Sequence, residues 1–405
     1  MSDYLVPPEL PALNDDLRSV FGRMSRLPDI DSADLTASDQ ADALGARIVA
    51  DLATSNPSML SEVLILNDSY GALCLAVCQH NGKVLSYQDR SSQAEAALRN
   101  SSHLGMDAGY TQLSFEELRR PAAALLQRLS ALRLVIVKLP RSNEELAWLA
   151  WTAARLCPQA TLIAVGLQKY MTPAQNTILS RYFARVQASR GFGKARALVA
   201  HRSNSTRDSP EPWQTSTHEV PVLPGGKLRI SGGSAVFGAS RLDPGSRLLI
   251  EVLGQTFRPL AGASVIDLGC GNGTLAVAAA LLHPQLQIHA VDQSASAVAA
   301  TNHSAQLNHV SAQISTTQMD GLALIDPGSA DHILLNPPFH SGHAVHAGIA
   351  HKLFDQAARV LKPGGQLWCV WNSPLRYRPI LQRSIGATEQ LARNQKFTVS
   401  VSTRD

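Results

Sequence analysis

The 405-residue sequence predicts an α/β protein whose two halves share one plan, a doubly wound sheet flanked by helices. Three observations lead to this prediction. Residues 265–275 read as a buried strand that runs into a glycine-rich turn and then a helix. A second apolar strand, 286–291, ends directly in Asp292. The same order of strand, turn and helix begins earlier in the chain, over residues 63–73.

The glycine-rich turn is the first candidate binding element. Gly269, Gly271 and Gly273 allow a tight turn and a close approach of the backbone to a ligand, and the helix that follows exposes unpaired N–H groups. Asn272 lies inside the turn, and Asp267 closes the strand before it. A nucleotide-like ligand fits this pattern. Since dinucleotide dehydrogenases carry such a turn too, the turn alone leaves the ligand open.

Two acids follow at the ends of later strands. Asp292 comes nineteen residues after Gly273, where a carboxylate can hold both hydroxyls of a ribose. Asp320 follows the short segment 317–319 and could accept a hydrogen bond from an adenine amino group. Taken alone, Asp320 also fits an ordinary turn residue. With the glycine turn, the two acids predict an adenosine-containing cofactor.

Residues 334–339 close a further apolar strand with an amide, two prolines and an aromatic ring. The side-chain oxygen of Asn336 and the carbonyl of Pro337 can each accept one N–H of a planar amine, which directs its lone pair at an electrophile. Pro338 restricts the turn, and Phe339 can stack on a base, worth roughly 1–3 kcal/mol. A strand end with a Pro-Pro turn is the alternative. A dehydrogenase would leave this segment unexplained.

The first half follows the same plan with different residues. Its turn keeps only Gly71, and Asp89 follows that glycine by eighteen residues. Lys138 ends a strand where the second half has Asn336. Side chains fill the space of the turn, those of Asp68, Ser69 and Tyr70. We therefore expect that the first half does not bind the cofactor.

Charge is distributed unevenly along the chain, although the net charge is only +4. Residues 1–45 carry nine acids and three arginines, whereas residues 146–207 carry no acid and nine Lys or Arg. A solvated face is one explanation, but a stretch this long without a carboxylate favours a polyanionic partner. The candidate RNA contacts are Lys138, Arg181, Arg185, Arg190, Lys194, Arg196 and Arg202.

Composition limits the remaining possibilities. A hydrophobic content of 45% with 17% charged residues is ordinary for globular domains, and no basic leader or long apolar run is present, so we expect a cytoplasmic protein. The five cysteines lie in apolar patterns and are expected to be reduced. The histidines of residues 340–351 could suggest a metal, but we expect none. His340 and His343 are instead expected to contact phosphates or the target base.

Together, the glycine turn, the two acids and the Asn-Pro-Pro-Phe segment resemble the class I S-adenosylmethionine-dependent methyltransferases that modify amino groups, over roughly residues 219–405. With a degenerate half in front, the chain resembles the bacterial ribosomal RNA guanine-N2 methyltransferases. The large-subunit type, rather than the related small-subunit type, is favoured by four segments, 63–73, 135–140, 194–196 and 394–397.

This resemblance implies two tandem class I methyltransferase-like (Rossmann-like) domains with doubly wound, seven-stranded sheets, the N-terminal one degenerate and used for RNA recognition. The expected boundaries are an acidic appendage at 1–45, the degenerate domain at 46–203, a linker at 204–226 and the catalytic domain at 227–405. Residues 237–245 resemble the segment that enters the catalytic domain beside the cofactor. Gly238 departs from that pattern, since a serine is common there.

The function implied by the resemblance is methyl transfer from S-adenosylmethionine to N2 of a guanine in 23S ribosomal RNA by a monomer. The catalytic candidates are Asn336, Pro337, Pro338 and Phe339. The cofactor-binding candidates are Asp267, Gly269, Gly271, Asn272, Gly273, Asp292, Asp320 and Asn336. The alternatives are methylation of 16S ribosomal RNA, of a release-factor glutamine or of adenine N6 in DNA, and a non-catalytic RNA-binding assembly factor.

Overall fold

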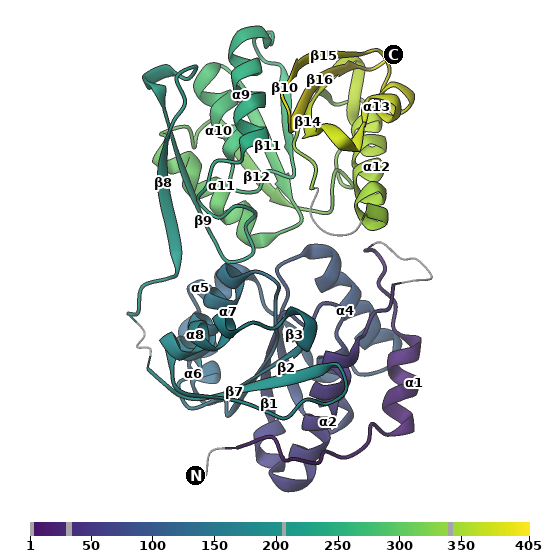
Figure 1. Cartoon of the computed structure of the whole chain (residues 1–405), viewed down its shortest axis with the longest axis vertical. Coiled ribbons are helices and arrows are strands. Elements are labelled where there is room, and N and C mark those ends of the chain that lie inside the picture. Colours follow the sequence, from purple (N-terminus) through teal and green to yellow (C-terminus); the bar gives the residue numbers. More distant parts are fainter. Residues whose placement is uncertain (1–3, 30–34, 205–207, 339–342) are drawn as a thin grey trace. The chain divides into compact units, whose positions relative to one another are not determined.

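The computed structural model describes residues 4–29, 35–204, 208–338 and 343–405, with the backbone only for 343–347. The chain divides into two compact units, Met1–Pro212 and Trp213–Asp405. Figure 1 shows the elements of both units in chain order. Each unit is built around its own seven-stranded sheet.

The N-terminal unit contains a mixed sheet in the order β3-β2-β1-β4-β5-β7-β6. Its strands are β1 (Glu62–Leu66), β2 (Lys83–Tyr87), β3 (Tyr110–Gln112), β4 (Leu134–Lys138), β5 (Thr161–Leu167), β6 (Phe183–Ala188) and β7 (Ala195–Ser203). The strands from β3 to β5 run parallel, and β7 is antiparallel to both of its neighbours. Strand order reverses between β1 and β4, the position at which doubly wound sheets bind ligands.

Helices cover both faces of this sheet. They are α1 (Asp15–Arg23), α2 (Gln40–Ser55), α3 (Ala72–Gln79), α4 (Ser91–His103), α5 (Phe115–Arg119), α6 (Ala123–Ser130), α7 (Asn143–Leu156) and α8 (Pro173–Tyr182). Helices α2 and α3 pack on β1, β4 and β5 through buried residues such as Leu44, Ile48 and Leu73. Elsewhere in the unit, Phe115 stacks on Trp148 with ring centroids 4.9 Å apart. Aliphatic and aromatic burial therefore both stabilise this unit.

The C-terminal unit repeats this topology strand for strand, in the order β12-β11-β10-β13-β14-β16-β15. Its strands are β10 (Ser264–Leu268), β11 (Gln287–Asp292), β12 (Ile314–Gln318), β13 (Ala330–Leu335), β14 (Leu361–Asn372), β15 (Thr388–Arg393) and β16 (Phe397–Thr403). A separate hairpin of β8 (Trp213–Glu219) and β9 (Lys227–Gly233) precedes them. The predicted fold of two tandem doubly wound sheets is confirmed.

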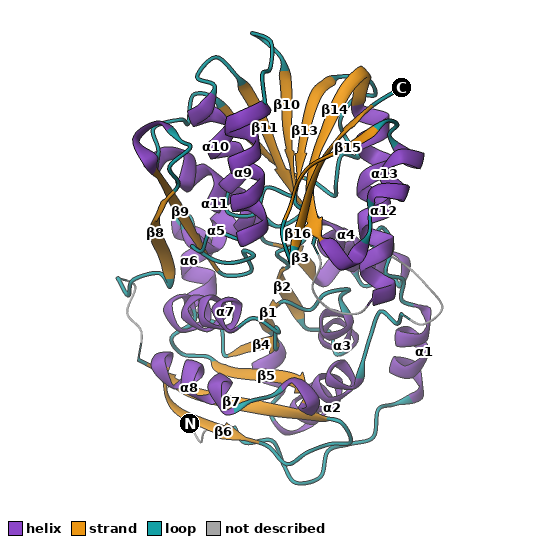
Figure 2. Ribbon diagram, turned by 45° about the horizontal axis from the view of Figure 1, so that its top comes forward, coloured by secondary structure: helices purple, strands orange, loops and turns teal. Residues whose placement is uncertain are grey.

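Alternate residues of β10 and β13 point to opposite faces of the second sheet, and each face has its own core. Val265 and Leu334 pack with α9 (Pro244–Thr256) and α10 (Thr274–Leu282), to which α11 (Ala295–Leu307) adds Ala305. Ile266 and Leu335 pack with α12 (His343–Val360) and α13 (Arg378–Ser384) on the other face. Figure 2 shows these two helical layers on either side of the strands.

Two expected segments contain more structure than their composition suggested. Within residues 1–45, Leu10 and Leu17 are buried, and α2 already begins at Gln40. Strand β8 lies inside the expected linker 204–226, and it is poor in apolar residues because it pairs only with β9 and is largely exposed. The boundaries 45/46 and 226/227 therefore remain proposals. No described helix is long and apolar enough to cross a membrane.

Candidate active site

The glycine turn joins β10 to α10, and all three of its predicted glycines have positive φ. The φ values of Gly269, Gly271 and Gly273 are +73°, +55° and +79°, a region that side chains other than glycine enter at a cost. A Cβ placed on Gly269 or Gly271 would meet no described atom within 4 Å, whereas one on Gly273 would lie 2.9 Å from Thr301 Cα. The first two glycines therefore border open space, and the third permits close packing on α11.

Asp292 ends β11 beside this turn. One oxygen of its carboxylate accepts a hydrogen bond from Gly271 N at 3.0 Å, and the other accepts from Ser294 N at 2.9 Å. The side chain is half-buried. The carboxylate is thus fixed at the carboxyl edge of the sheet, next to the open space above the glycines.

Asp267 lies under the turn and is buried. Its Oδ2 accepts from Ala276 N at 2.9 Å, while Oδ1 has no partner among the described residues. Burial raises the pKa of this carboxyl to about 7, with a further contribution from the nearby charge of Asp292. Asp267 therefore anchors the start of α10 and has no exposed surface with which to meet a ligand.

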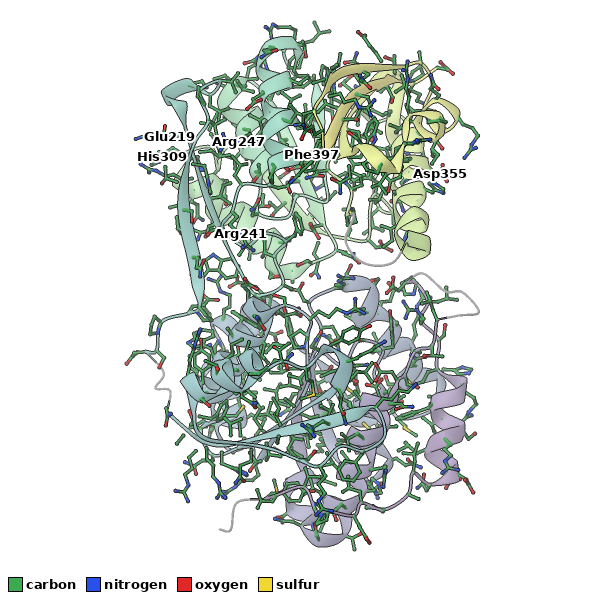
Figure 3. The ribbon with its side chains drawn as sticks, viewed as in Figure 1. Glu219, Arg241, Arg247, His309, Asp355 and Phe397 are labelled. Atoms are coloured by element: carbon green, nitrogen blue, oxygen red, sulfur yellow. The ribbon has the colours of Figure 1, made fainter. Side chains whose placement is uncertain are left out.

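The side chain of Asn272 is fully engaged inside the protein. Its Nδ2 donates to the carbonyls of Ala239 and Arg241, each at 3.1 Å, and its Oδ1 accepts from the Thr274 hydroxyl at 2.6 Å. The expected contact of this side chain with the cofactor is therefore not what the structure describes. Asn272 instead holds the segment 237–245 against the glycine turn, and Figure 3 labels Arg241 in that segment.

Asp320 follows β12 and forms an ion pair that sequence reasoning missed. Its Oδ2 lies 2.5 Å from Nζ of Lys352 on α12, and both side chains are about one-third exposed. Gln356 of the same helix accepts from Leu322 N at 2.9 Å. Helix α12 thus fixes the loop after β12, and one oxygen of Asp320 is already used by a cation.

Asn336 follows β13 and carries the most informative contacts of the site. Its Nδ2 donates to Asp243 Oδ2 and to Ser246 Oγ, both at 2.9 Å. Its Oδ1 is buried and has no hydrogen-bond partner among the described residues. Because a carboxylate can only accept, Asp243 determines which end of the amide faces it. The oxygen of Asn336 is therefore an acceptor that has no donor among the described residues.

Sequence reasoning missed Asp243 and Ser246, although the sequence holds a signal for them. Asp243 is the N-cap of α9, accepting from Ser246 N at 2.9 Å, and Pro244 takes the first helical position. An acid followed by proline is a typical helix start. Gly245 lets this first turn pack on Phe397, since a Cβ there would lie 3.1 Å from the ring. Figure 3 labels Phe397.

The structure describes only part of the rest of the Asn-Pro-Pro-Phe segment and of the histidines that follow it. Pro337 is buried and Pro338 is exposed. Phe339 and His340 lie outside the described residues, and His343 begins α12 with its side chain outside them as well. The structure therefore gives the amide and the two prolines, and the expected roles of the ring and the two histidines stay predictions.

Comparison with known proteins follows the same division into two units. Residues 16–204 match the RLMG N-terminal domain, and residues 227–401 match the methyltransferase small domain. A curated relative from Pseudomonas syringae pv. syringae, ribosomal RNA large subunit methyltransferase G, is 33% identical and covers 92% of this chain and 95% of its own length. The chain belongs to this family.

Further relatives carry the same name. The Pseudomonas aeruginosa protein is 33% identical and the Streptomyces coelicolor protein 30%, and they cover 92% and 93% of this chain and 95% and 96% of their own lengths. Among solved structures, the T. thermophilus 16S rRNA N2 methyltransferase RsmC, in complex with AdoMet and guanosine, has a TM-score of 0.70 at 22% identity. It covers 91% of this chain and 92% of its own, and it supports the tandem fold.

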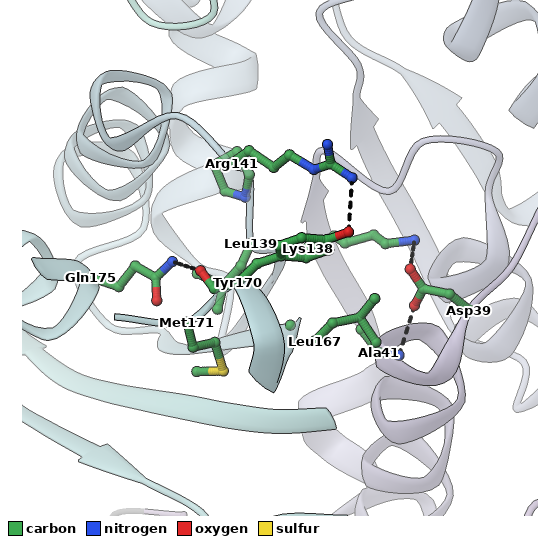
Figure 4. A pocket seen from close by; sticks show the side chains of 11 residues that line it. Asp39, Ala41, Lys138, Leu139, Arg141, Leu167, Tyr170, Met171 and Gln175 are labelled. Carbon is green, nitrogen blue, oxygen red and sulfur yellow. Dashed lines mark hydrogen bonds and ion pairs between the residues drawn. The ribbon is translucent and has the colours of Figure 1, made fainter. Parts of the chain in front are cut away.

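In this methyltransferase G family member, the expected RNA contacts of the N-terminal unit fall into two groups. Six are exposed on α8, β6, β7 and the adjoining turn, namely Arg181, Arg185, Arg190, Lys194, Arg196 and Arg202. Lys138 differs, because its Nζ lies 2.7 Å from Asp42 and 3.5 Å from Asp39. Figure 4 shows Lys138 beside Asp39. The lysine forms an internal ion pair, and we withdraw it from the proposed RNA contacts.

Two remaining features concern cysteines and metals. All five cysteines are free thiols, and burial raises the pKa of each of them, for example that of Cys78 to about 11. Among the side chains that the structure describes, no three His, Cys, Asp or Glu residues are grouped as metal ligands would be.

Proposed function

We propose that this chain transfers a methyl group from S-adenosylmethionine to the exocyclic N2 of a guanine in 23S ribosomal RNA. The observation that carries the proposal is the amide of Asn336, whose nitrogen is anchored twice and whose buried oxygen lacks a described partner. An acceptor in that state fits the N–H of a planar amine. Membership in the methyltransferase G family supports the large ribosomal subunit as the source of the guanine.

The residues at the carboxyl edge of the second sheet fit the cofactor. Gly269 and Gly271 leave room where side chains would stand, and Asp292 is held by Gly271 N beside that room. We assign the hydroxyls of the ribose to Asp292 and an adenine amino group to the oxygen of Asp320 that Lys352 does not hold. When bound, S-adenosylmethionine supplies an electrophilic methyl group on a sulfonium. Asp267 supports this site from below through α10.

Catalysis by this chain consists mainly of orientation. An amino group on a nucleobase is a weak nucleophile because its lone pair is delocalised into the ring. Asn336 Oδ1 and the Pro337 carbonyl each accept one N–H, which leaves the lone pair directed toward the methyl group. Attack makes the nitrogen cationic, so its proton leaves afterwards to water or to one of these oxygens. A strong general base is not required.

Substrate binding is assigned to the basic surface of the N-terminal unit. The exposed arginines and lysine of α8, β6 and β7 belong to a stretch, residues 146–207, that contains no acid. Such side chains contact phosphates, which gives affinity and register without reading bases. We expect binding of large-subunit RNA to weaken steeply as the salt concentration rises.

The role of Asn336 is tested by Asn336→Ala. Methyl transfer should fall about 100- to 1000-fold, as it does when one preorganised hydrogen-bonding group is removed from an active site. The dissociation constant for S-adenosylmethionine, measured by calorimetry, should change little. A variant that turns over at the wild-type rate would remove Asn336 from the mechanism.

A further inference from the structure

We propose that Asp243 and Ser246 are positioning residues that lock the amide of Asn336 in one orientation. This inference rests on the proposed role of Asn336 and extends it to the first turn of α9. Both residues lie 90 or more positions earlier in the chain, and both accept from Nδ2 at 2.9 Å.

The need for such a lock follows from the symmetry of the amide. Rotation of Asn336 about its last side-chain bond exchanges Oδ1 for Nδ2 with almost no change in shape. In the exchanged state Nδ2 would face the methyl acceptor and would repel the N–H groups of a guanine amine. The carboxylate of Asp243 makes that state costly, because it has no proton to donate and would then face an oxygen. The Ser246 hydroxyl adds an acceptor for Nδ2 in the orientation that the structure describes.

Asp243 is suited to this task because its own position is fixed. The same Oδ2 that accepts from Asn336 accepts from Ser246 N as the N-cap of α9. Ser246 is buried at the third position of the helix. Helix α9 packs against the core below β13 through Leu249 and Leu253. The hydrogen bonds that orient Asn336 therefore come from a packed helix, and the orientation of its amide is set before the substrate binds.

Specificity follows from the same contacts. With the amide locked, the site offers an acceptor at Asn336, so it selects a group that carries N–H donors. A base that presents a carbonyl at that position would place two acceptors against each other. The lock thus contributes to selection of an amine as well as to rate.

Capping and positioning by Asp243 can be separated with two substitutions. Ser and Asn are both good N-caps, so Asp243→Ser and Asp243→Asn should each retain the start of α9. The serine hydroxyl ends one bond earlier and no longer reaches Asn336 Nδ2. The asparagine carbonyl can occupy the place of Oδ2 and accept both hydrogen bonds. Ser246→Ala removes the second acceptor alone.

The experiment measures kcat and KM on large-subunit RNA together with the dissociation constant for S-adenosylmethionine. Asp243→Ser should lower kcat about 10- to 100-fold with both other constants nearly unchanged, the scale expected when a reacting group is misplaced. Asp243→Asn should restore most of that loss, and Ser246→Ala should lower kcat less than Asp243→Ser does. Asp331→Ser is the matched control, since Asp331 accepts from Ser264 N at the other end of the sheet.

Two outcomes would overturn the inference. One is equal kcat for Asp243→Ser and Asp243→Asn, whether high or low. The other is a loss that falls on KM or on cofactor affinity. Either result with an inactive Asn336→Ala leaves the proposed function intact, whereas an active Asn336→Ala would refute the role of Asn336 itself.

Discussion

The residue that ends the central strand beside the reversal point differs between the two units, but its surroundings match. In the C-terminal unit, Asn336 follows β13 and contacts the N-cap and the third residue of α9, Asp243 and Ser246. The nitrogen of the amide is used, and the oxygen is left as an acceptor. The oxygen at this position therefore has no donor among the described residues, as the proposed role of Asn336 requires.

In the N-terminal unit, Lys138 ends β4 and contacts the N-cap and the third residue of α2, Asp39 and Asp42. Burial alone would lower the pKa of Lys138, but the two carboxylates more than offset this, so its pKa lies above the ordinary value. An ammonium group has donors only. The same site in the fold has thus become a closed ion pair with no acceptor to offer.

The turns above these residues differ in the same way. Asn67 and Ser69 adopt φ values of +62° and +63°, close to those of Gly269 and Gly271. The backbone path is retained in the N-terminal unit, but side chains stand where the C-terminal unit has open space. The comparison teaches that two turns can share one conformation and differ in the space that they leave for a ligand.

The residue at the end of the second strand also differs between the two units. Gln88, and not Asp89, corresponds to Asp292, because its Oε1 accepts from Ser69 N at 2.9 Å as Asp292 accepts from Gly271 N. Asp89 instead accepts from the Tyr87 hydroxyl at 3.0 Å. An amide in place of a carboxylate further reduces the capacity of the first unit to hold a ribose.

The largest expected effect comes from placing the lysine of the N-terminal unit at the position of Asn336 in the C-terminal unit. Asn336→Lys should place an ammonium against Asp243 and remove the only side-chain acceptor that we assign to the amine, lowering methyl transfer about 1000-fold or more. Single-turnover transfer of a labelled methyl group measures this. Folding should persist, as circular dichroism can check. An active Asn336→Lys variant would contradict the proposed difference between the two units, in which only Asn336 offers an acceptor.

Removing the charge of Lys138 tests whether its ion pair with Asp42 stabilises the fold. Lys138→Met leaves Asp42 buried without its cation and should lower the free energy of unfolding by about 3–5 kcal/mol. Denaturant unfolding measures the loss. The double variant Lys138→Met, Asp42→Leu should recover most of the stability. A single variant as stable as the wild type would contradict a structural role.

Single residues can also be exchanged between the turn after β10 and the corresponding turn after β1. Gly271→Ser copies Ser69 and adds a side chain at φ +55°, which costs roughly 1–2 kcal/mol and fills open space. That strain lowers fold stability with or without ligand, whereas the added side chain occupies the proposed cofactor space, so the affinity for S-adenosylmethionine should fall about 10-fold or more, or about 1.4 kcal/mol. The reverse change, Ser69→Gly, should leave cofactor affinity as it is. Equal affinities for Gly271→Ser and the wild type would show that the space above the turn is not used.

A further expected effect concerns the pH dependence of stability. Asp267 has a folded pKa of about 7, raised by burial above the unfolded value, so the folded state binds the extra proton between about pH 4 and 7. The free energy of unfolding should therefore fall as pH rises through this window, by at most about 1.4 kcal/mol per pH unit from this group. Asp267→Asn should reduce this slope without removing it, since burial also raises the pKa of Asp42 to about 7 and that of Glu145 to about 8. An unchanged slope would mean that Asp267 is ionised throughout.

Sequence patterns predicted the parts of this structure that are local. Apolar runs indicate the strands β10, β11 and β13, and the pattern places Gly269, Asp292 and Asn336 at or directly after their ends, while the roles of these residues stay proposals. The contacts of Asp243 with Asn336 and of Asp42 with Lys138 were missed, since they join residues 93 and 96 positions apart. Strand β8 falls inside the proposed linker, and its low apolar content fits a largely exposed strand that pairs with β9. Such features depend on which elements meet in space.

The most direct test of the central claim identifies the methylated product. The protein is incubated with labelled S-adenosylmethionine and, separately, with both ribosomal subunits, naked 16S and 23S RNA, DNA and a release factor. Mass spectrometry of the labelled material should show N2-methylguanine in large-subunit RNA, and Asn336→Ala should lower its rate of formation about 100- to 1000-fold. Label in 16S RNA, in DNA adenine or in a glutamine side chain would contradict the proposed function.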